Sequence, residues 1–196
     1  MKTRSQSEPA SSAEGQLILV DSHNACIGHS KKLTCHLNEG ILHRAFSVLL
    51  FNTHGELLLQ KRSQKKMLWP GYWSNSCCSH PVKGENIISA AQRRTIEELG
   101  LKTSLSPIYE FQYHAKYLDI GAEHEFCSVL VGISDQEPKA CPEEASELCY
   151  IGVEKLDNRI KNEPEQFTPW FTMEWQTLRS RYWSQIEPLI ARRLAG

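Results

Sequence analysis

The chain of 196 residues is 40% hydrophobic and 23% charged, the composition of an ordinary globular domain with enough chain for one sizeable core. Its formal net charge of −1 excludes broad electrostatic attraction to nucleic acid or to an anionic membrane, so we expect neither as a partner. Seven cysteines without a C-x-x-C pair, and no secretory signal, predict reduced thiols in a cytoplasmic protein. No exposed amphipathic seam stands out, and we expect a monomer.

The N-terminal end differs in composition from the rest of the chain. Residues 1–16 are rich in Ser, Glu and Ala and include Pro9, a pattern typical of a disordered tail. We expect the remainder, 17–196, to form a single domain. The longest apolar runs, such as 46–51, have the length of a strand and are far too short to span a bilayer.

Taken in chain order, the pattern alternates short apolar runs with turn-forming residues. Gly55 closes a predicted hairpin turn at 52–55, because glycine readily adopts the positive φ that such a turn requires. Residues 61–70 form a basic loop, and Gly71 and Pro81 bound a turn-rich segment. Apolar and β-branched runs predict strands over 17–20, 45–51, 57–62, 108–117, 125–133 and 149–153.

Helical periodicity is strongest at 85–99, and Gly100 follows as a terminator. One face of this helix carries apolar or small residues at helical spacing, namely Ile88, Ala91, Thr95 and Leu99. A turn of helix is expected at 143–148, and a longer helix over 170–181 after Pro169. This order predicts the α+β class, a mixed α/β sandwich with helices flanking a central mixed sheet.

The predicted helix also carries charged residues at the spacing of a Nudix box, whose pattern is Gly-x5-Glu-x7-Arg-Glu-apolar-x-Glu-Glu-x-Gly-apolar. The matching positions are Glu85, Arg93, Glu97, Glu98 and Gly100. Carboxylates on one helical turn suit Mg²⁺, which also binds phosphate oxygens. Arg94 stands where the box has a glutamate, and it adds a bidentate phosphate donor. The helix is therefore expected to hold a diphosphate rather than to hydrolyse one, whereas the bland interpretation is a solvated charged face.

A second constellation combines imidazoles with carboxylates. His36 and His43 lie seven residues apart, and Glu123 and Glu125 share one face of a strand because side chains alternate with a period of two. Together with His80 they offer a mixed nitrogen and oxygen set suited to Mn²⁺ or Zn²⁺. Taken singly, each histidine is more often structural.

The segment 75–81 reads Asn-Ser-Cys-Cys-Ser-His-Pro and places a thiol two residues before His80. A thiolate is an effective nucleophile or base near neutral pH, and nearby cations favour it. Aromatic residues such as Trp170 are typical of a core, but they also suit the lining of a hydrocarbon pocket. Four basic side chains are candidates for an anionic ligand, namely Lys32, Arg62, Lys66 and Arg94.

These segments together closely resemble the type 1 isopentenyl diphosphate isomerases, metal-dependent members of the Nudix superfold. The resemblance spans roughly residues 17–185 and rests on 36–47, 69–71, 75–81, 93–100, 123–125 and 168–170. It implies a Nudix-like fold and one Mn²⁺ or Zn²⁺ held by His36, His43, His80, Glu123 and Glu125. It also implies Mg²⁺ held by Glu98 and the backbone carbonyl of Cys78, with a small-molecule diphosphate bound by Lys32, Arg62, Lys66 and Arg94.

The implied reaction moves a double bond by one carbon, from isopentenyl diphosphate to dimethylallyl diphosphate, through a tertiary carbocation in isoprenoid biosynthesis. We expect Glu125, close to Tyr113, to deliver a proton on one face of the substrate. Cys78 is expected as the opposing acid or base, its thiolate favoured by nearby cations. Trp170 is expected to place its π face against the cation.

Two other functions remain open at this point. A Nudix-type diphosphate hydrolase would use the same fold and the same Mg²⁺ helix, but Arg94 removes one of the carboxylates that it needs. A non-catalytic module would use the histidines and glutamates as a structural metal site. Structural zinc usually prefers Cys-rich tetrahedra, whereas this set is rich in carboxylates.

Overall fold

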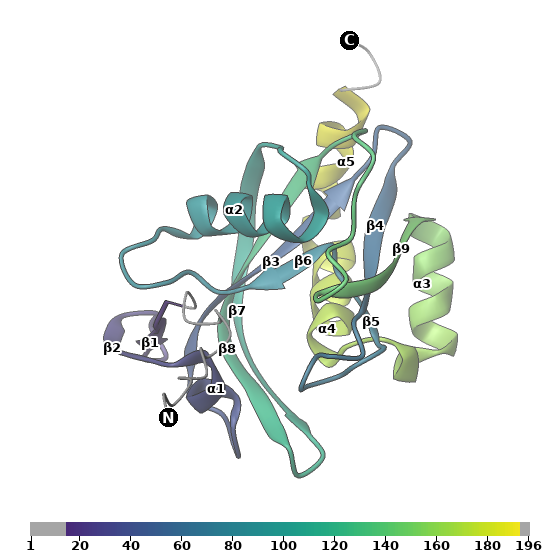
Figure 1. The fold of residues 1–196 in the computed structure, drawn as a ribbon. Coiled ribbons are helices and arrows are strands. Elements are labelled where there is room, and N and C mark those ends of the chain that lie inside the picture. Colours follow the sequence, from purple (N-terminus) through teal and green to yellow (C-terminus); the bar gives the residue numbers. More distant parts are fainter. Residues whose placement is uncertain (1–14, 193–196) are drawn as a thin grey trace, which may run out of the picture.

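A mixed β-sheet forms the middle of the fold, with helices packed against both of its faces (Figure 1). The computed structural model describes residues 15–192. The strands are β1 Leu17–Val20, β2 Cys26–Ser30, β3 His43–Phe51, β4 Glu56–Arg62, β5 Trp73–Ser74, β6 Cys77–Ser79, β7 Leu105–Tyr117, β8 Gly121–Ile133 and β9 Ala145–Gly152. The helices are α1 Lys32–His36, α2 Ile87–Leu99, α3 Val153–Asn162, α4 Pro169–Thr177 and α5 Trp183–Arg192, with a 3-10 turn at Pro164–Gln166 and a π-helical turn at Leu178–Tyr182.

Strand β3 is the hub of the sheet. It runs parallel to β8 along its whole length and antiparallel to β1, β4 and β6. Strands β7 and β8 form a long antiparallel hairpin, and β9 pairs with β4. The predicted α+β class with a central mixed sheet is confirmed.

The core divides into two clusters because side chains alternate along β3. Phe46, Val48 and Leu50 pack beneath α2, whereas Leu49 and Phe51 pack on the other face against α3, α4 and α5. All five of these side chains are buried. The two faces of one strand therefore separate the Glu-rich helix α2 from the aromatic helix α4.

Helix α2 ends at Leu99 before Gly100 as predicted, and it begins at Ile87, two residues after the predicted start. The side chain of Asn86 accepts a hydrogen bond from the backbone of Ser89, and Gly100 adopts a φ of +67° at the C-terminal end. The predicted buried face is wrong at one position, because Ile88 is 40% exposed. Small Ala90 faces the sheet in its place, which lets the helix lie close to the strands.

Two other local predictions need correction. The predicted helical turn at 143–148 is wrong, since residues from Ala145 onward belong to β9 and pair with β4. The backbone groups of β4 need a partner on that side, and this tertiary pairing overrides local helix propensity. The helix predicted over 170–181 divides into α4 and the π-helical turn.

The hairpin turn is confirmed, since Gly55 has a φ of +77° and its N–H donates to the carbonyl of Asn52 over 3.1 Å. Most of the tail predicted over 1–16 falls on residues 1–14, outside the described residues. None of the helices within 15–192 is long and apolar enough to cross a membrane.

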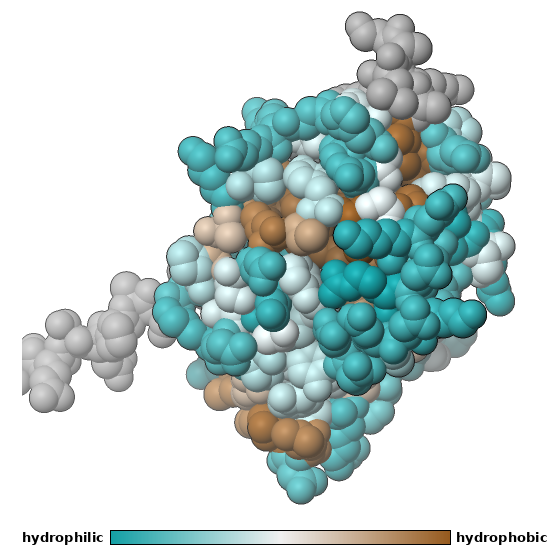
Figure 2. Space-filling model, turned by 90° about the vertical axis from the view of Figure 1, so that its right-hand side faces the viewer, coloured by the Kyte–Doolittle hydropathy of each residue, from teal (hydrophilic) through white to brown (hydrophobic). Residues whose placement is uncertain are grey.

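Hydrophilic side chains cover most of the face shown in Figure 2. Hydrophobic surface appears there in a few patches, one of them at the lower end of the molecule, where Figure 1 shows the turn of the β7–β8 hairpin. Leu118 and Ile120 belong to this turn and are 68% and 44% exposed.

Candidate active site

Three histidines and two glutamates from four separate segments meet at one end of the sheet. Their ligand atoms all lie within 4.8 Å of one another, and all five residues are buried: His36, His43, His80, Glu123 and Glu125. This is the set predicted from the sequence. Among the residues that the structure describes, it is the cluster with the composition of a metal site.

The register of the strands explains why the cluster forms. His43, the first residue of β3, is the direct partner of Glu125 in β8, and Glu123 lies two residues earlier on the same face. His36 ends α1, which approaches β8 closely at Gly121. A Cβ atom at Gly121 would lie 2.1 Å from the carbonyl oxygen of His36, so only glycine permits this approach.

Two backbone carbonyls fix the imidazoles in the orientation that a metal needs. His36 Nδ1 lies 2.7 Å from the Lys32 carbonyl and His43 Nδ1 lies 2.7 Å from the Ile41 carbonyl. Since a carbonyl only accepts, both Nδ1 atoms carry a hydrogen, and a lone pair on Nε2, where that atom carries no proton, points into the cluster. His43 Nε2 has no hydrogen-bond partner among the described residues.

The carboxylate side of the cluster is equally suited to a cation. Glu123 Oε2 lies 3.0 Å from His36 Nε2, so that a proton or a metal ion must separate two atoms that both accept. Burial lowers the pKa of His36, but the neighbouring Glu123 outweighs burial and raises it. Burial holds the pKa of His80 well below its ordinary value, which keeps that ring neutral. The donor set therefore fits a divalent metal ion.

Glu125 connects this cluster to a phenol. Tyr113 lies directly opposite Glu125 in the β7–β8 ladder, and its hydroxyl donates to Glu125 Oε2 over 2.7 Å. His80 Nε2 lies 2.8 Å from the other carboxylate oxygen. Burial opposes ionisation of Glu125, yet the neighbouring imidazoles of His43 and His80 hold its pKa well below the ordinary value. The phenol and the carboxylate thus form one proton-sharing pair.

A cavity of about 250 Å³ opens beside this pair. Its lining combines the metal cluster, the phenol, a thiol, an indole and several basic side chains, among them Tyr113, Glu125, Cys78, Trp170, Arg62 and Lys66. The apolar wall and the cationic rim suit a ligand with a short hydrocarbon part and an anionic end.

The adjacent cysteines 77 and 78 face opposite sides of the sheet. Cys77 is buried in the cluster beneath α2, whereas Cys78 packs toward α4 and lines the cavity. The expectation that nearby cations favour a thiolate at Cys78 meets opposing effects from the surrounding side chains. Burial and the carboxyl of Glu174 raise the pKa of the Cys78 thiol well above its ordinary value, and Arg62 opposes them only in part. The side chains around Cys78 therefore favour the thiol over the thiolate.

Arg62 lies between the cavity and the loop that follows β4. Its guanidinium donates to the carbonyls of Leu68 and Trp69 at 2.8–3.2 Å. Trp69 has a φ of +46°, which is an uncommon conformation for a bulky residue and is held in part by these bonds. Arg62 Cζ also lies 5.2 Å from the ring centroid of Trp170. The side chain predicted to bind diphosphate thus also shapes the cavity wall.

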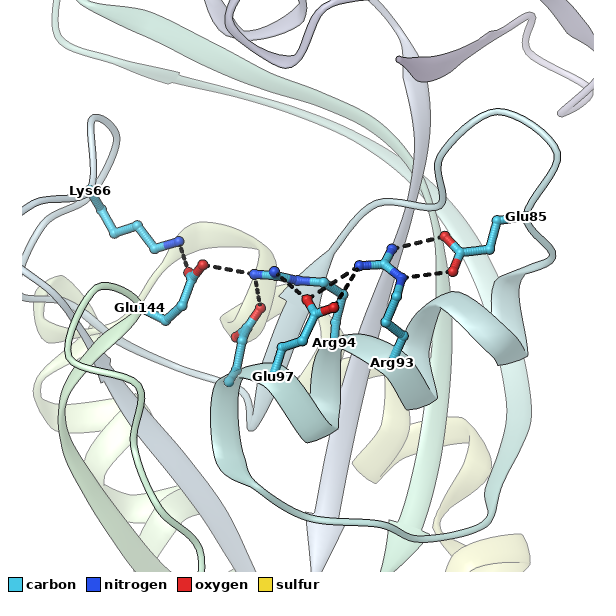
Figure 3. A network of polar contacts seen from close by, with 7 residues as sticks. Lys66, Glu85, Arg93, Arg94, Glu97 and Glu144 are labelled. Carbon is cyan, nitrogen blue, oxygen red and sulfur yellow. Dashed lines mark hydrogen bonds and ion pairs between the residues drawn. The ribbon is translucent and has the colours of Figure 1, made fainter. Parts of the chain in front are cut away.

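The Nudix-box helix carries a continuous chain of alternating charges (Figure 3). Glu85 accepts two hydrogen bonds of 2.8 Å from Arg93, which in turn pairs with Glu97. The chain continues through Arg94, whose NH2 nitrogen lies 2.7 Å from both Glu98 and Glu144, and ends at Lys66.

Three of the four predicted phosphate-binding side chains line the cavity, and Arg94 does not. Arg94 reaches the cavity indirectly, because Glu144 contacts both Arg94 and Lys66. Glu98, predicted to bind Mg²⁺, is 1% exposed, and burial raises its pKa. It lies close to the thiol of Cys77 on the α2 side of β6.

Sequence reasoning missed Glu144 and Glu174. Glu144 contacts Lys66 only because β9 pairs with β4, a pairing hidden by the helical interpretation of 143–148. Glu174 had a usable signal, since it lies one helical turn after Trp170 and therefore on the same buried face.

Comparison with known proteins identifies the family. The NUDIX domain model matches residues 41–171. An isopentenyl-diphosphate Delta-isomerase 1 from Photorhabdus laumondii is 42% identical over 172 residues, which cover 87% of this chain and 98% of that protein. The chain belongs to the isopentenyl-diphosphate Delta-isomerase family.

More distant isomerases and solved structures agree with this membership. A chloroplastic isopentenyl-diphosphate Delta-isomerase II from Arabidopsis thaliana is 35% identical, covering 89% of this chain and 70% of that protein. The crystal structure of DR0079 from Deinococcus radiodurans has a TM-score of 0.67 at 22% identity, covering 82% of this chain and 97% of that chain. A MutT protein from Methanosarcina mazei has a TM-score of 0.58 at 16% identity, covering 71% and 96%. These structural similarities establish the Nudix fold of this isomerase family member.

Proposed function

We propose that the chain converts isopentenyl diphosphate into dimethylallyl diphosphate within the cavity beside the metal cluster. The observation that carries the proposal is the Tyr113–Glu125 hydrogen bond of 2.7 Å in a cavity that Cys78 also lines. Membership in the isopentenyl-diphosphate Delta-isomerase family supports the same activity.

The reaction requires two proton transfers. A proton added to the terminal carbon of the alkene gives a tertiary carbocation, and removal of a proton from the neighbouring methylene forms the new double bond. Water would trap the cation, so the site must exclude it. Trp170 and Tyr113 are 1% and 5% exposed and provide a wall of that kind.

The proton-sharing pair and the thiol act as the two acid–base groups. In one direction a proton leaves the Glu125–Tyr113 pair for the alkene, and Cys78 as its thiolate accepts the proton lost from the cation. In the reverse direction the thiol of Cys78 donates and the pair accepts. Each turnover leaves the two groups with exchanged protonation states, and solvent that enters the open cavity restores them.

The side chains of the buried cluster fit one divalent metal ion. His36, His43, His80, Glu123 and Glu125 would hold one Mn²⁺ or Zn²⁺, which increases the acidity of the proton on the Glu125–Tyr113 pair. Glu98 and the Cys78 carbonyl would hold Mg²⁺, which neutralises charge on the diphosphate.

The diphosphate end of the substrate is bound by basic side chains at the cavity rim. Lys32, Arg62 and Lys66 line the cavity, and Arg94 joins them through the carboxylate of Glu144. At the other end, the ring of Trp170 faces the carbocation, an interaction of about 2 kcal/mol when desolvated. Positioning and water exclusion supply the larger share of the rate enhancement.

Diphosphate hydrolysis is the less favoured alternative. A Nudix hydrolase needs a full set of carboxylates on its helix, and here Arg94 replaces one of them and neutralises Glu98 at 2.7 Å. We further propose a cytoplasmic monomer without nucleic-acid or membrane partners. The net charge of −1 supports the absence of nucleic-acid and membrane partners. The seven cysteines all lie within the described residues and form no disulfide, which supports a reducing compartment.

The test is incubation of the purified protein with isopentenyl diphosphate and Mg²⁺ in D₂O, followed by NMR. Dimethylallyl diphosphate that carries deuterium, without released phosphate, is the expected product. Release of monophosphate would support hydrolysis instead. No reaction in a sample confirmed to contain metal would favour a binding module and overturn the proposal.

A further inference from the structure

A carboxyl group lies buried behind the cavity, and neither proton transfer uses it. Glu174 in α4 is fully buried, with no exposed surface. It follows Trp170 by one helical turn, so both side chains project from the same face of α4. Burying a carboxyl is costly unless it is hydrogen-bonded, and here a directed set of hydrogen bonds ends on it.

Most of the hydrogen-bond directions in this set follow from the groups themselves. Trp170 Nε1 can only donate, and its partner 3.3 Å away is Asn75 Oδ1. The amide nitrogen of Asn75 donates to Ser47 Oγ over 2.6 Å and to the carbonyl of Cys77 over 2.7 Å. Ser47 Oγ donates in turn to Glu174 Oε2 over 2.6 Å. Glu174 is thus the terminal acceptor of a closed loop from α4 through β3 back to α4.

This loop of hydrogen bonds touches both walls of the active site. Ser47 in β3 is the direct antiparallel partner of Cys78 in β6, so their side chains lie next to each other on one face. Asn75 holds the carbonyl of Cys77, the residue just before Cys78. The ring of Trp170 forms the opposite wall.

We propose that Glu174 is a positioning residue that fixes Cys78 and Trp170 relative to each other through Ser47 and Asn75. The walls that carry Cys78 and Trp170 come from distant segments of the chain, and 95 positions separate Asn75 from Trp170. Without a terminal acceptor the Ser47 hydroxyl turns elsewhere, and the Asn75 amide loses the orientation that holds both walls. The proposal rests on the proposed roles of Cys78 and Trp170.

The acceptor function of Glu174 does not need a charge. Burial raises the pKa of Glu174 to about 8, so that the group is largely protonated at neutral pH. The side-chain oxygen of glutamine accepts from Ser47 in the same way, whereas leucine has similar bulk and no acceptor. Glu174→Gln and Glu174→Leu therefore separate acceptance of a hydrogen bond from the presence of an acid.

The experiment compares Glu174→Leu, Glu174→Gln and Ser47→Ala, with Met173→Ala as the control for a change in α4, since Met173 is 37% exposed. We expect Glu174→Leu and Ser47→Ala each to lower kcat about tenfold, with KM within about twofold. Glu174→Gln and Met173→Ala should retain kcat within about twofold. The double variant of Ser47→Ala and Glu174→Leu should be no slower than either single variant, because both break one chain.

A second readout does not depend on turnover. The indole N–H signal of Trp170, identified by its loss in Trp170→Phe, should shift in Glu174→Leu and Ser47→Ala and stay in place in Glu174→Gln. Inactive wild-type protein would defeat the proposed function, while these shifts would still test the positioning role. If Glu174→Leu does not fold, the kcat and the indole signal of Ser47→Ala test the positioning role instead. An unchanged kcat and indole signal in Ser47→Ala, or equal losses in Glu174→Gln and Glu174→Leu, would overturn the proposal.

Discussion

Arg94 and Glu144 lie fifty positions apart in the chain, yet their side chains meet at 2.7 Å. The same guanidinium nitrogen contacts Glu98, and the second oxygen of Glu144 contacts Lys66. Lys66 and Arg94, two of the four side chains proposed to bind the diphosphate, are therefore held in place before any ligand arrives. This order depends on the pairing of β9 with β4, which carries Glu144 to the rim of the cavity.

Replacement of Glu144 should destabilise the protein in a pH-dependent way. Lys66 and Arg94 hold the pKa of Glu144 at about 2 against the opposing effect of burial. Glu144→Gln should therefore lower the free energy of unfolding by about 1–3 kcal/mol at pH 7. Because the folded pKa is depressed, the difference is complete above about pH 4.5 and disappears as the pH falls toward 2. Urea titrations of both proteins at several pH values measure it, and equal stabilities at pH 7 would contradict it.

Glu174 should show the opposite pH dependence. Burial raises its pKa to about 8, so the unfolded chain releases this proton at lower pH than the folded protein does. The contribution of Glu174 to the free energy of unfolding of the wild-type protein therefore falls as the pH rises from about 4.5 to 8. At pH 8 the Glu174→Gln variant should have the larger free energy of unfolding, by up to several kcal/mol. The groups that interact with Glu174 are the Ser47 hydroxyl, the thiols of Cys127 and Cys78, the carboxylate of Glu125 and the phenol of Tyr109. Thermal unfolding at pH 4 and pH 8 tests this, with no difference expected at pH 4.

Cys78→Ala should lower kcat by about 10²–10⁴-fold or more while the far-UV circular dichroism spectrum is unchanged. Cys77→Ala is the matched control, because it removes the adjacent thiol on the α2 side of the sheet. Cys77→Ala should lower stability through lost packing and keep most of the turnover. A rate near wild type in Cys78→Ala would remove the thiol from the reaction.

Chelation should abolish turnover without unfolding the chain. We expect about one equivalent of transition metal per chain by mass spectrometry, and its loss in His43→Ala, because the lone pair of His43 Nε2 points into the cluster. His114→Ala removes an exposed histidine of β7 outside the cluster and should retain the metal. Unfolding of the metal-free protein would indicate a structural metal site, and equal metal contents in both variants would exclude the cluster.

The sequence was most informative where function depends on local spacing. The period of two along a strand predicts that Glu123 and Glu125 share a face, and the resemblance to the family strengthened the choice of three histidines among eight. The pairing of strands that lie far apart in the chain could not be predicted from local spacing. Glu144 was missed because the segment 143–148, which includes the first half of β9, was interpreted as helix, and no local pattern shows which strand a short apolar run will join.

The charge environment of Cys78 also required the structure. Sequence placed Arg62 and Lys66 near the thiol, but it did not place the buried carboxyl of Glu174 behind it. That carboxyl arrives from α4, and only the packing of α4 on the sheet sets its distance from the thiol. The sequence therefore predicted a thiolate at Cys78, whereas the surrounding side chains favour the thiol.

The shortness of α1 couples local order to metal binding. A helix of five residues has too few internal hydrogen bonds to persist alone, yet it supplies His36 to the cluster. Its end is fastened to the sheet at the bridge between Leu37 and Gly121. A ligand that binds His36 therefore also stabilises α1 against local unfolding. Slower amide hydrogen exchange across 32–36 would then report that the metal site is occupied, even in the absence of substrate.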